Sequence, residues 1–279
     1  MPGRNTAQAR RLLRAAAKAA LVRITAAEAA RQRRRHDGLA ILYWHRVGRG
    51  LDVLAVSPRS FRRACDEIAA SGLRVVDAGA LGDVSIAPGE RVVALTFDDG
   101  YADLLDHAVP ELARRGWPAS VFVVPGAVDG TVRFGDIYRA DRHPRFMSWD
   151  EMRDVERGSA VRFEAHSLTH RDLPPLTDDE ARSEISGCAE AVARELGRPA
   201  RLFCYPRGYF GSREQRLCEE AGYVGAVGTE YGVNRQPFDR YALCRTIFDG
   251  FDDRLVMRAR IRGLVDRPPA LRRSRASGP

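Results

Sequence analysis

The stretch Val92-Val93-Ala94-Leu95-Thr96-Phe97-Asp98-Asp99-Gly100 indicates both the fold and the place of its chemistry. Five of its first six residues are apolar, as in a strand that is buried on both faces of a parallel sheet. The glycine permits a sharp turn, so both carboxylates can face the same edge. One could bind a metal ion while the other accepts a proton from water. As an isolated motif, the segment is equally consistent with a turn that caps the next helix.

Similar short apolar runs recur along the chain and alternate with amphipathic stretches. This alternation is typical of repeated βα units and a largely parallel sheet. We therefore expect an α/β fold, a distorted (β/α) barrel of seven to eight strands in a single domain. The expected strands are residues 40–45, 73–77, 92–97, 120–124, 161–165, 201–205, 224–228 and 243–247.

The expected helices fill the gaps between these strands, and several of their starts are marked. Ser57 precedes Pro58, a residue suited to the first turn of a helix. Three segments fit the capping-box pattern: Ser148 with Glu151, Thr177 with Glu180 and Ser212 with Gln215. The helix after Thr177 has one apolar face, formed by Ala181, Ile185, Cys188, Val192 and Leu196.

The net charge of +8 is unevenly distributed. Residues 1–38 alone sum to +8 and residues 258–279 to +6, so the part between them is mildly acidic. We expect a basic arm over 1–37, the barrel over 38–265 and a disordered basic tail over 266–279. The acidic body argues against nucleic-acid binding. Residues 10–35 could form a basic amphipathic helix on an anionic membrane, a solvated extension, or a segment that contacts nucleic acid.

The five cysteines include no C-x-x-C pair, which predicts free thiols in a reducing compartment. No apolar stretch is long enough for a membrane span, and the first residues do not resemble a secretory signal. We therefore expect a location in the cytoplasm or at the cytoplasmic face of the membrane.

A second chemistry-bearing segment contains two histidines, His166 and His170, directly after the expected strand 161–165. On a helical turn, residues four apart share one face, so both imidazoles could reach one divalent ion. Together with Asp99 they form a two-histidine, one-carboxylate set that suits Zn²⁺, with Co²⁺, Ni²⁺ or Mn²⁺ as alternatives. Ser167 and Thr169 could orient the rings.

Two further strand ends complete the candidate site. His45 follows the first strand and could lie opposite the metal as a general acid, although a lone histidine is often structural. The turn Tyr205-Pro206-Arg207-Gly208 follows another strand, and its backbone N–H groups could bind a developing oxyanion.

These segments, in this order, resemble the polysaccharide deacetylases of carbohydrate esterase family 4, which share the NodB-homology domain. The resemblance extends from about Ile41 to Ile247. It implies metal-dependent removal of N-acetyl groups from an amino sugar, with Asp98 as the general base. It also implies that the metal ligands are Asp99, His166 and His170.

The chain departs from the family pattern at two points. Many members have an arginine in the third motif that braces the catalytic aspartate, and here Cys204 stands nearest that position. Arg207 and Arg245 are the candidates to replace it. The family's late general-acid histidine has no counterpart, because no histidine follows His170. A branch of the family takes this acid from an N-terminal strand instead, and the segment that begins Tyr43-Trp44-His45 resembles it.

Three functions are consistent with these features. The first is a deacetylase of a glycan or glycan precursor that contains N-acetylhexosamine. The second is a catalytically weak sugar-binding or scaffold protein at the membrane surface. The third is a hydrolase of another C–N bond on the same fold. Paired carboxylates beside a metal set favour an enzyme, because a binding module does not need them.

Overall fold

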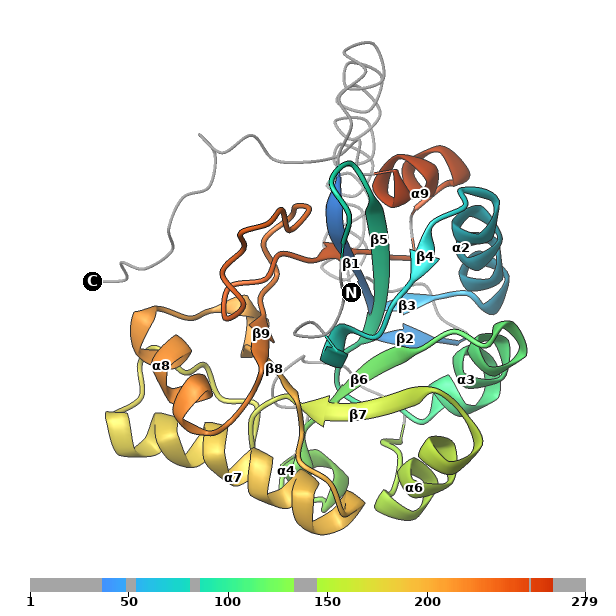
Figure 1. Cartoon of the computed structure of the whole chain (residues 1–279). Helices are drawn as coiled ribbons and strands as arrows, with labels where there is room; N and C mark the ends of the chain where they lie inside the picture. Colours follow the sequence, from blue (N-terminus) through green and yellow to red (C-terminus); the bar gives the residue numbers. More distant parts are fainter. Residues whose placement is uncertain (1–36, 49–53, 81–85, 133–144, 251, 263–279) are drawn as a thin grey trace, which may run out of the picture.

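A curled parallel sheet forms the centre of the computed structural model, which describes residues 37–48, 54–80, 86–132, 145–250 and 252–262 (Figure 1). The strands run in the order β10-β1-β5-β6-β7-β8-β9, and β4 pairs with β5 beside this path. Their bounds are β1 Gly38–Trp44, β4 Arg74–Val75, β5 Arg91–Phe97, β6 Ala119–Val123, β7 Val161–Ala165, β8 Leu202–Cys204, β9 Gly225–Val227 and β10 Thr246–Ile247. This confirms the distorted (β/α) barrel and all eight expected strands.

One small sheet was not expected from the sequence. It pairs β2 (Arg46–Val47) with β3 (Ala55–Val56) directly after β1. Both strands lie outside the longer apolar runs from which the other strands were expected, so the pattern did not reveal them.

Helices cover the outside of the sheet (Figure 1). They are α2 Pro58–Ala70, α3 Asp103–Arg115, α4 Pro125–Val128, α6 Trp149–Gly158, α7 Asp178–Leu196, α8 Ser212–Glu220 and α9 Arg254–Ile261. Two short 3₁₀ turns, η1 Ala78–Ala80 and η2 Pro206–Gly208, lie between them. Within the described part of the chain, no helix has the length and apolarity to span a membrane.

The expected helix caps are present except at α8. Ser57 caps α2, and capping boxes form at Ser148 and Thr177. At α8, the predicted pairing of Ser212 with Gln215 is wrong by one residue. Gly211 is the N-cap, and its N–H donates to Oε2 of Glu214 at 2.6 Å.

The side chains of the sheet alternate between two cores. Along β1, Leu42 and Trp44 pack outward against the helices, while Leu39 and Ile41 point into the barrel. The outward-facing side of the sheet also receives the predicted apolar face of α7, where Ile185 and Val192 are fully buried. Alternation decides which residues beyond the strand ends face the barrel mouth.

Several predictions fall on residues that the structure does not describe. These are almost all of the arm over 1–37, with its expected membrane contact at residues 10–35, and the tail over 266–279. The five cysteines lie in the described part, and each is a free, buried thiol.

Candidate active site

The inward face of the barrel brings the predicted chemical groups together at the carboxyl ends of the strands. Continuing the inward line of β1 beyond Ile41 leads through Tyr43 to His45. The same alternation on β5 leads from Ala94 to Asp98, and His166 lies just beyond β7. Because parallel strands end at one edge, these residues converge although they are distant in sequence.

Asp98 is buried and tightly held. Nη1 and Nη2 of Arg245 donate to Oδ1 and Oδ2 of Asp98 at 2.6 and 2.8 Å. Burial alone would raise the pKa of Asp98, but the charge and the hydrogen bonds of Arg245 outweigh it and lower the pKa to about 2. The carboxylate therefore stays ionised and fixed in orientation, as a general base requires.

Arg245 is itself completely buried, and its surroundings explain how the barrel tolerates the charge. Its Nε donates to the carbonyl of Gly228 at 2.8 Å, and its guanidinium stacks over the ring of Tyr43 at 4.1 Å. Nη2 also contacts Sγ of Cys204 at 3.1 Å. Of the two arginines considered as braces for the base, the structure places Arg245 in that position. Arg207 instead pairs with Asp172 at 3.3 Å.

Asp99 lies in a left-handed turn with φ of 72°, followed by Gly100 with the same φ. Both of its carboxylate oxygens are fully buried, with no well-formed hydrogen bond to the described residues. Burial, and next the charge of Asp98, raise the pKa of Asp99 well above its usual value. An orphaned buried carboxylate of this kind is what a cation would stabilise.

The two histidines approach Asp99 from one loop. Nε2 of His166 and Nε2 of His170 lie 3.6 and 3.8 Å from Oδ1 of Asp99, and the two rings are perpendicular with centroids 4.8 Å apart. The helical turn predicted for this segment is wrong: Ser167 and His170 both adopt left-handed conformations in an irregular loop. The loop, rather than helical periodicity, brings the rings together.

Hydrogen bonds hold the loop in this shape. Nδ1 of His166 lies 2.7 Å from the carbonyl of Cys204, so we assign the proton to Nδ1 and leave Nε2 available as a ligand. Ser167 accepts from the N–H of His170 at 2.9 Å, and Thr169 binds the carboxylate of Glu184. Ser167 and Thr169 thus position the loop backbone.

The residues fit a divalent metal ion. The ligand atoms of Asp99, His166 and His170 all lie within 4.8 Å of one another. Burial lowers the pKa of His166 to about 4 and that of His170 well below its usual value, so both rings are neutral and able to coordinate. The set also suits Zn²⁺ and its first-row neighbours by ligand type.

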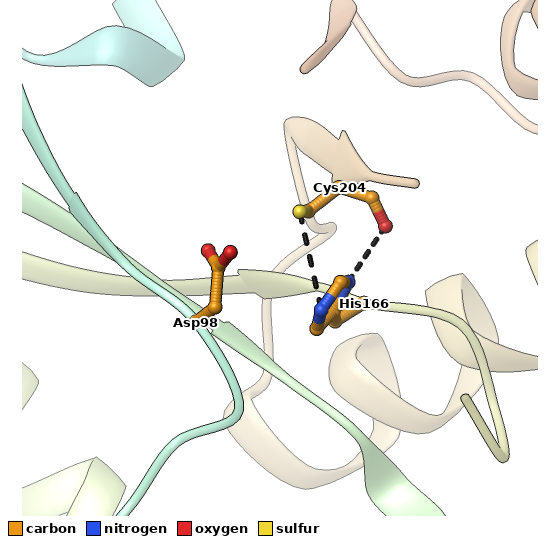
Figure 2. Close-up of side chains that lie close together, drawn as sticks. All are labelled: Asp98, His166 and Cys204. Atoms are coloured by element: carbon orange, nitrogen blue, oxygen red, sulfur yellow. Dashed lines mark hydrogen bonds between the residues drawn. The ribbon is translucent and has the colours of Figure 1, made fainter. Parts of the chain in front are cut away.

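A second group of potential ligands shares His166 with this set. Asp98, His166 and Cys204 also lie within 4.8 Å of one another, and Figure 2 shows the sulfur and the imidazole facing each other. The separation of Cys204 Sγ and His166 Nε2 is 4.0 Å. The guanidinium of Arg245 contacts both Asp98 and Cys204, so a cation between them would meet a fixed positive charge. The Asp99 group is therefore the better metal site.

His45 follows β1, and its imidazole faces the carboxylate of Asp98. Its Nε2 is 4.0 Å from Oδ2 of Asp98, and its side chain is 14% exposed. It therefore combines contact with the buried base and access to solvent, which a residue that donates a proton to a leaving group needs.

The turn at Tyr205 to Gly208 has a narrower role than the sequence suggested. The Tyr205 side chain is fully buried and donates its hydroxyl to the carbonyl of Tyr241 at 3.0 Å. The amides of Tyr205 and Gly208 donate to Val227 and Tyr205. Pro206 has no N–H, so Arg207 is the remaining amide in this turn. Arg207 has φ of 53°.

Backbone strain is concentrated at this site. Among the described residues, the non-glycine positions with positive φ are Asp99, Ser167, His170 and Arg207. Each such position is costly for an L-residue, and such strain clusters where function requires it. The four positions belong to the three segments that the sequence singled out.

Comparison with known proteins agrees with the fold. The model of the polysaccharide deacetylase family matches residues 85–226. YxkH of Bacillus subtilis (strain 168), which carries a polysaccharide deacetylase designation, is 24% identical over 210 residues, 74% of this chain and 70% of YxkH. The poly-beta-1,6-N-acetyl-D-glucosamine N-deacetylase of Escherichia coli (strain K12) is 36% identical over 83 residues, 28% of this chain but only 12% of that enzyme.

A solved structure with the same fold is IcaB from Ammonifex degensii. Its TM-score is 0.69 at 23% identity, over 81% of this chain and 97% of that chain. The barrel and its Asp-His-His mouth define a hydrolase of the carbohydrate esterase type. The chain belongs to the polysaccharide deacetylase family, as its motifs indicated.

Proposed function

We propose that this protein is a metal-dependent deacetylase that hydrolyses the N-acetyl groups of a glycan containing N-acetylhexosamine. The observation that carries the proposal is that a braced, ionised Asp98 lies beside the Asp99–His166–His170 ligand set at one barrel mouth, and that both imidazoles of this set are neutral. A scaffold protein would not need the buried carboxylate of Asp99, which makes no well-formed hydrogen bond within the described part of the chain, or the strained backbone at Ser167 and His170 beside it.

The residues of the chain divide the reaction between them. Asp98 accepts the proton of the attacking water, and Arg245 keeps its carboxylate aimed while it does so. The amide of Arg207 donates to the oxyanion that develops from the acetamide carbonyl. His45, protonated, donates to the nitrogen of the leaving amine. A divalent metal ion held by Asp99, His166 and His170 would supply Lewis-acid activation of the water and the carbonyl.

A polymer of N-acetylglucosamine is the substrate class we favour. Support comes from the E. coli relative, whose name states that it removes N-acetyl groups from poly-beta-1,6-N-acetyl-D-glucosamine. The position of His45 after the first strand is also consistent with the branch of the family that takes its general acid from an N-terminal strand. We propose Zn²⁺ as the metal, because two imidazoles and one carboxylate with open positions suit it.

The first experiment is acetate release by the purified full chain, stripped of metal and reloaded with Zn²⁺ or Co²⁺. The substrates are beta-1,6-linked N-acetylglucosamine oligomers, chitin fragments, a nucleotide sugar and a purine-derived amide. Metal-dependent acetate from the oligomers is expected. Hydrolysis of the purine-derived amide alone would instead support a hydrolase that acts on another C–N bond. Metal binding without any turnover would support a binding role.

Replacing Asp98 tests the assignment of the base. The substitution Asp98→Asn keeps the size and removes the proton acceptor, so turnover should fall at least ~100-fold. Metal content should stay near that of the wild type, because the ligands are untouched. Metal-reloaded protein would be assayed for acetate release and for metal by mass spectrometry. Unchanged turnover would remove Asp98 from this role.

A further inference from the structure

A hollow lined with arginines lies on the outer wall of the barrel, between α2 and α3. It has a volume of about 340 Å³ and is lined by Arg59, Arg62, Arg63, Asp66, Glu111, Arg114 and Arg115. Five guanidinium groups thus surround two carboxylates. We call this feature the arginine hollow. It stands out because the body of the chain is mildly acidic, so its positive charge is local.

The two carboxylates of the hollow are already engaged. Glu111 accepts from both Arg114 and Arg115 at 2.7 Å, and Arg115 also reaches Asp66 at 2.5 Å. These contacts hold Arg115 in place, and its side chain is only 12% exposed. The carboxylates therefore fix the wall of the hollow and leave its net charge positive.

The three arginines of α2 are different. Arg59, Arg62 and Arg63 are exposed, and none forms a hydrogen bond or ion pair with any described residue. Their guanidinium groups keep all five N–H donors, in the planar geometry that binds phosphate oxygens in pairs. The hollow thus presents unused anion-binding capacity on a rigid helix.

Helix α9 extends the basic character along the same side. Figure 1 shows α9 on one side of α2 and α3 on the other side. Arg254 and Arg258 of α9 are well exposed and share Glu67 of α2. Leu255, between them in the sequence, is 58% exposed. No other large hydrophobic side chain among the described residues is classed as exposed. Residues 258–279, which comprise the second half of α9 and the segment after it, sum to +6.

We propose that the arginine hollow, together with the outer side of α9, docks on the anionic surface of a lipid bilayer. Phosphate headgroups would occupy the hollow, while Leu255 would contact the interfacial region. Basic residues beside an exposed leucine suit a bilayer better than a nucleic acid, whose backbone offers no apolar layer. The surface lies on the barrel wall and not at the strand ends, so it serves attachment and leaves the active-site mouth open.

The test is binding of the full chain to phosphatidylcholine vesicles with and without phosphatidylglycerol, measured by co-sedimentation. The variant Arg59→Gln, Arg62→Gln, Arg63→Gln removes the unpaired arginines. Partitioning onto the anionic vesicles should fall on the order of 100-fold, because each of the three arginines near such a surface contributes roughly fivefold. Vesicles without phosphatidylglycerol should bind weakly in every case.

A matched variant separates local from general charge effects. Arg157→Gln, Arg182→Gln, Arg194→Gln removes the same charge from exposed positions of α6 and α7, and it should bind like the wild type. Equal binding by both triple variants would overturn the proposal and assign attachment to the basic segments outside the barrel. Tighter binding to a double-stranded oligonucleotide than to anionic vesicles, lost in the α2 variant, would also overturn it. Thermal unfolding of both variants checks that each is folded.

Discussion

The ion pair of Asp98 and Arg245 is the feature at the residue scale that the chemistry depends on most. Neither group is exposed, and two short hydrogen bonds join them. A buried charge that loses its partner is strongly destabilising, whereas the pair together keeps the base ionised. Arg245 directly precedes β10, and its guanidinium also contacts Sγ of Cys204 on β8 at 3.1 Å.

Removing the guanidinium should uncouple the base from its brace. In Arg245→Ala, kcat should fall at least ~100-fold with a much smaller change in KM, because Arg245 is completely buried and acts through Asp98. Added guanidinium at low concentration should restore part of the activity by refilling the space. The same addition should not help Asp98→Asn, which lacks the acceptor. If Arg245→Ala does not fold, Arg245→Lys, which keeps the charge without the bidentate geometry, should show an intermediate kcat.

Replacing a histidine tests which ligand group binds the metal. His166→Ala should lose both metal and activity, because His166 belongs to both groups of potential ligands. His170→Ala should do the same if the metal lies at Asp99. Cys204→Ser should retain its metal. Metal content after dialysis against a weak chelator gives the answer, and loss of metal in Cys204→Ser alone would move the ion toward Asp98.

At the scale of elements, loops of irregular backbone decide the site more than helices or strands do. The strands fix only the direction in which Asp98 and His166 point. Positive φ values occur at Asp99, Ser167 and His170, in the segments that bring the ligand atoms of Asp99, His166 and His170 within 4.8 Å of one another. Periodicity carries no information about such conformations, which is why the sequence predicted a helical turn where the chain forms a loop.

The turn at Gly208 should be sensitive to substitution. Gly208 has φ of 75°, and an added Cβ would lie 2.1 Å from Oγ1 and 2.7 Å from the backbone N of Thr229. Gly208→Ala should therefore lower the free energy of unfolding by more than about 2 kcal/mol. Gly197→Ala, at φ of 70° with no atom within 4 Å, is the control and should cost only about 1 kcal/mol. Equal losses in urea titrations would contradict the clash.

For the whole molecule, a buried carboxyl inside the barrel links stability to pH. Glu164 is 2% exposed and accepts from the amides of Arg201 and Leu202 at 2.5 and 2.9 Å. Burial nevertheless raises its pKa from 4.5 to about 7. Between these values the folded chain keeps a proton that the unfolded chain releases, so rising pH favours unfolding.

Glu164→Gln should remove this dependence. Relative to the variant, the wild type should lose about 3 kcal/mol of unfolding free energy as pH rises from about 4.5 to about 7. Urea titrations at several pH values measure the difference, and comparison with the variant cancels all other titrating groups. Glu190→Gln, an exposed change on α7, serves as the control. Parallel pH profiles for wild type and Glu164→Gln would contradict the shift.

The sequence by itself determined the strands, most helix starts and the residues at the strand ends. Alternation and apolar runs are local properties, so Asp98, Asp99, His166 and His170 could be identified without coordinates. His45 was identified by its place after the first strand, and the structure puts it 4.0 Å from Asp98.

Only the tertiary structure decided which distant groups meet. Arg245 and Asp98 are 147 positions apart, and they touch because β10 pairs with β1 and β1 with β5. The carbonyl of Cys204 sets the tautomer of His166 across two neighbouring strands. The arginine hollow likewise needs α2 and α3 side by side. Such contacts follow from the order of strands in a curled sheet, and no local pattern of residues encodes that order.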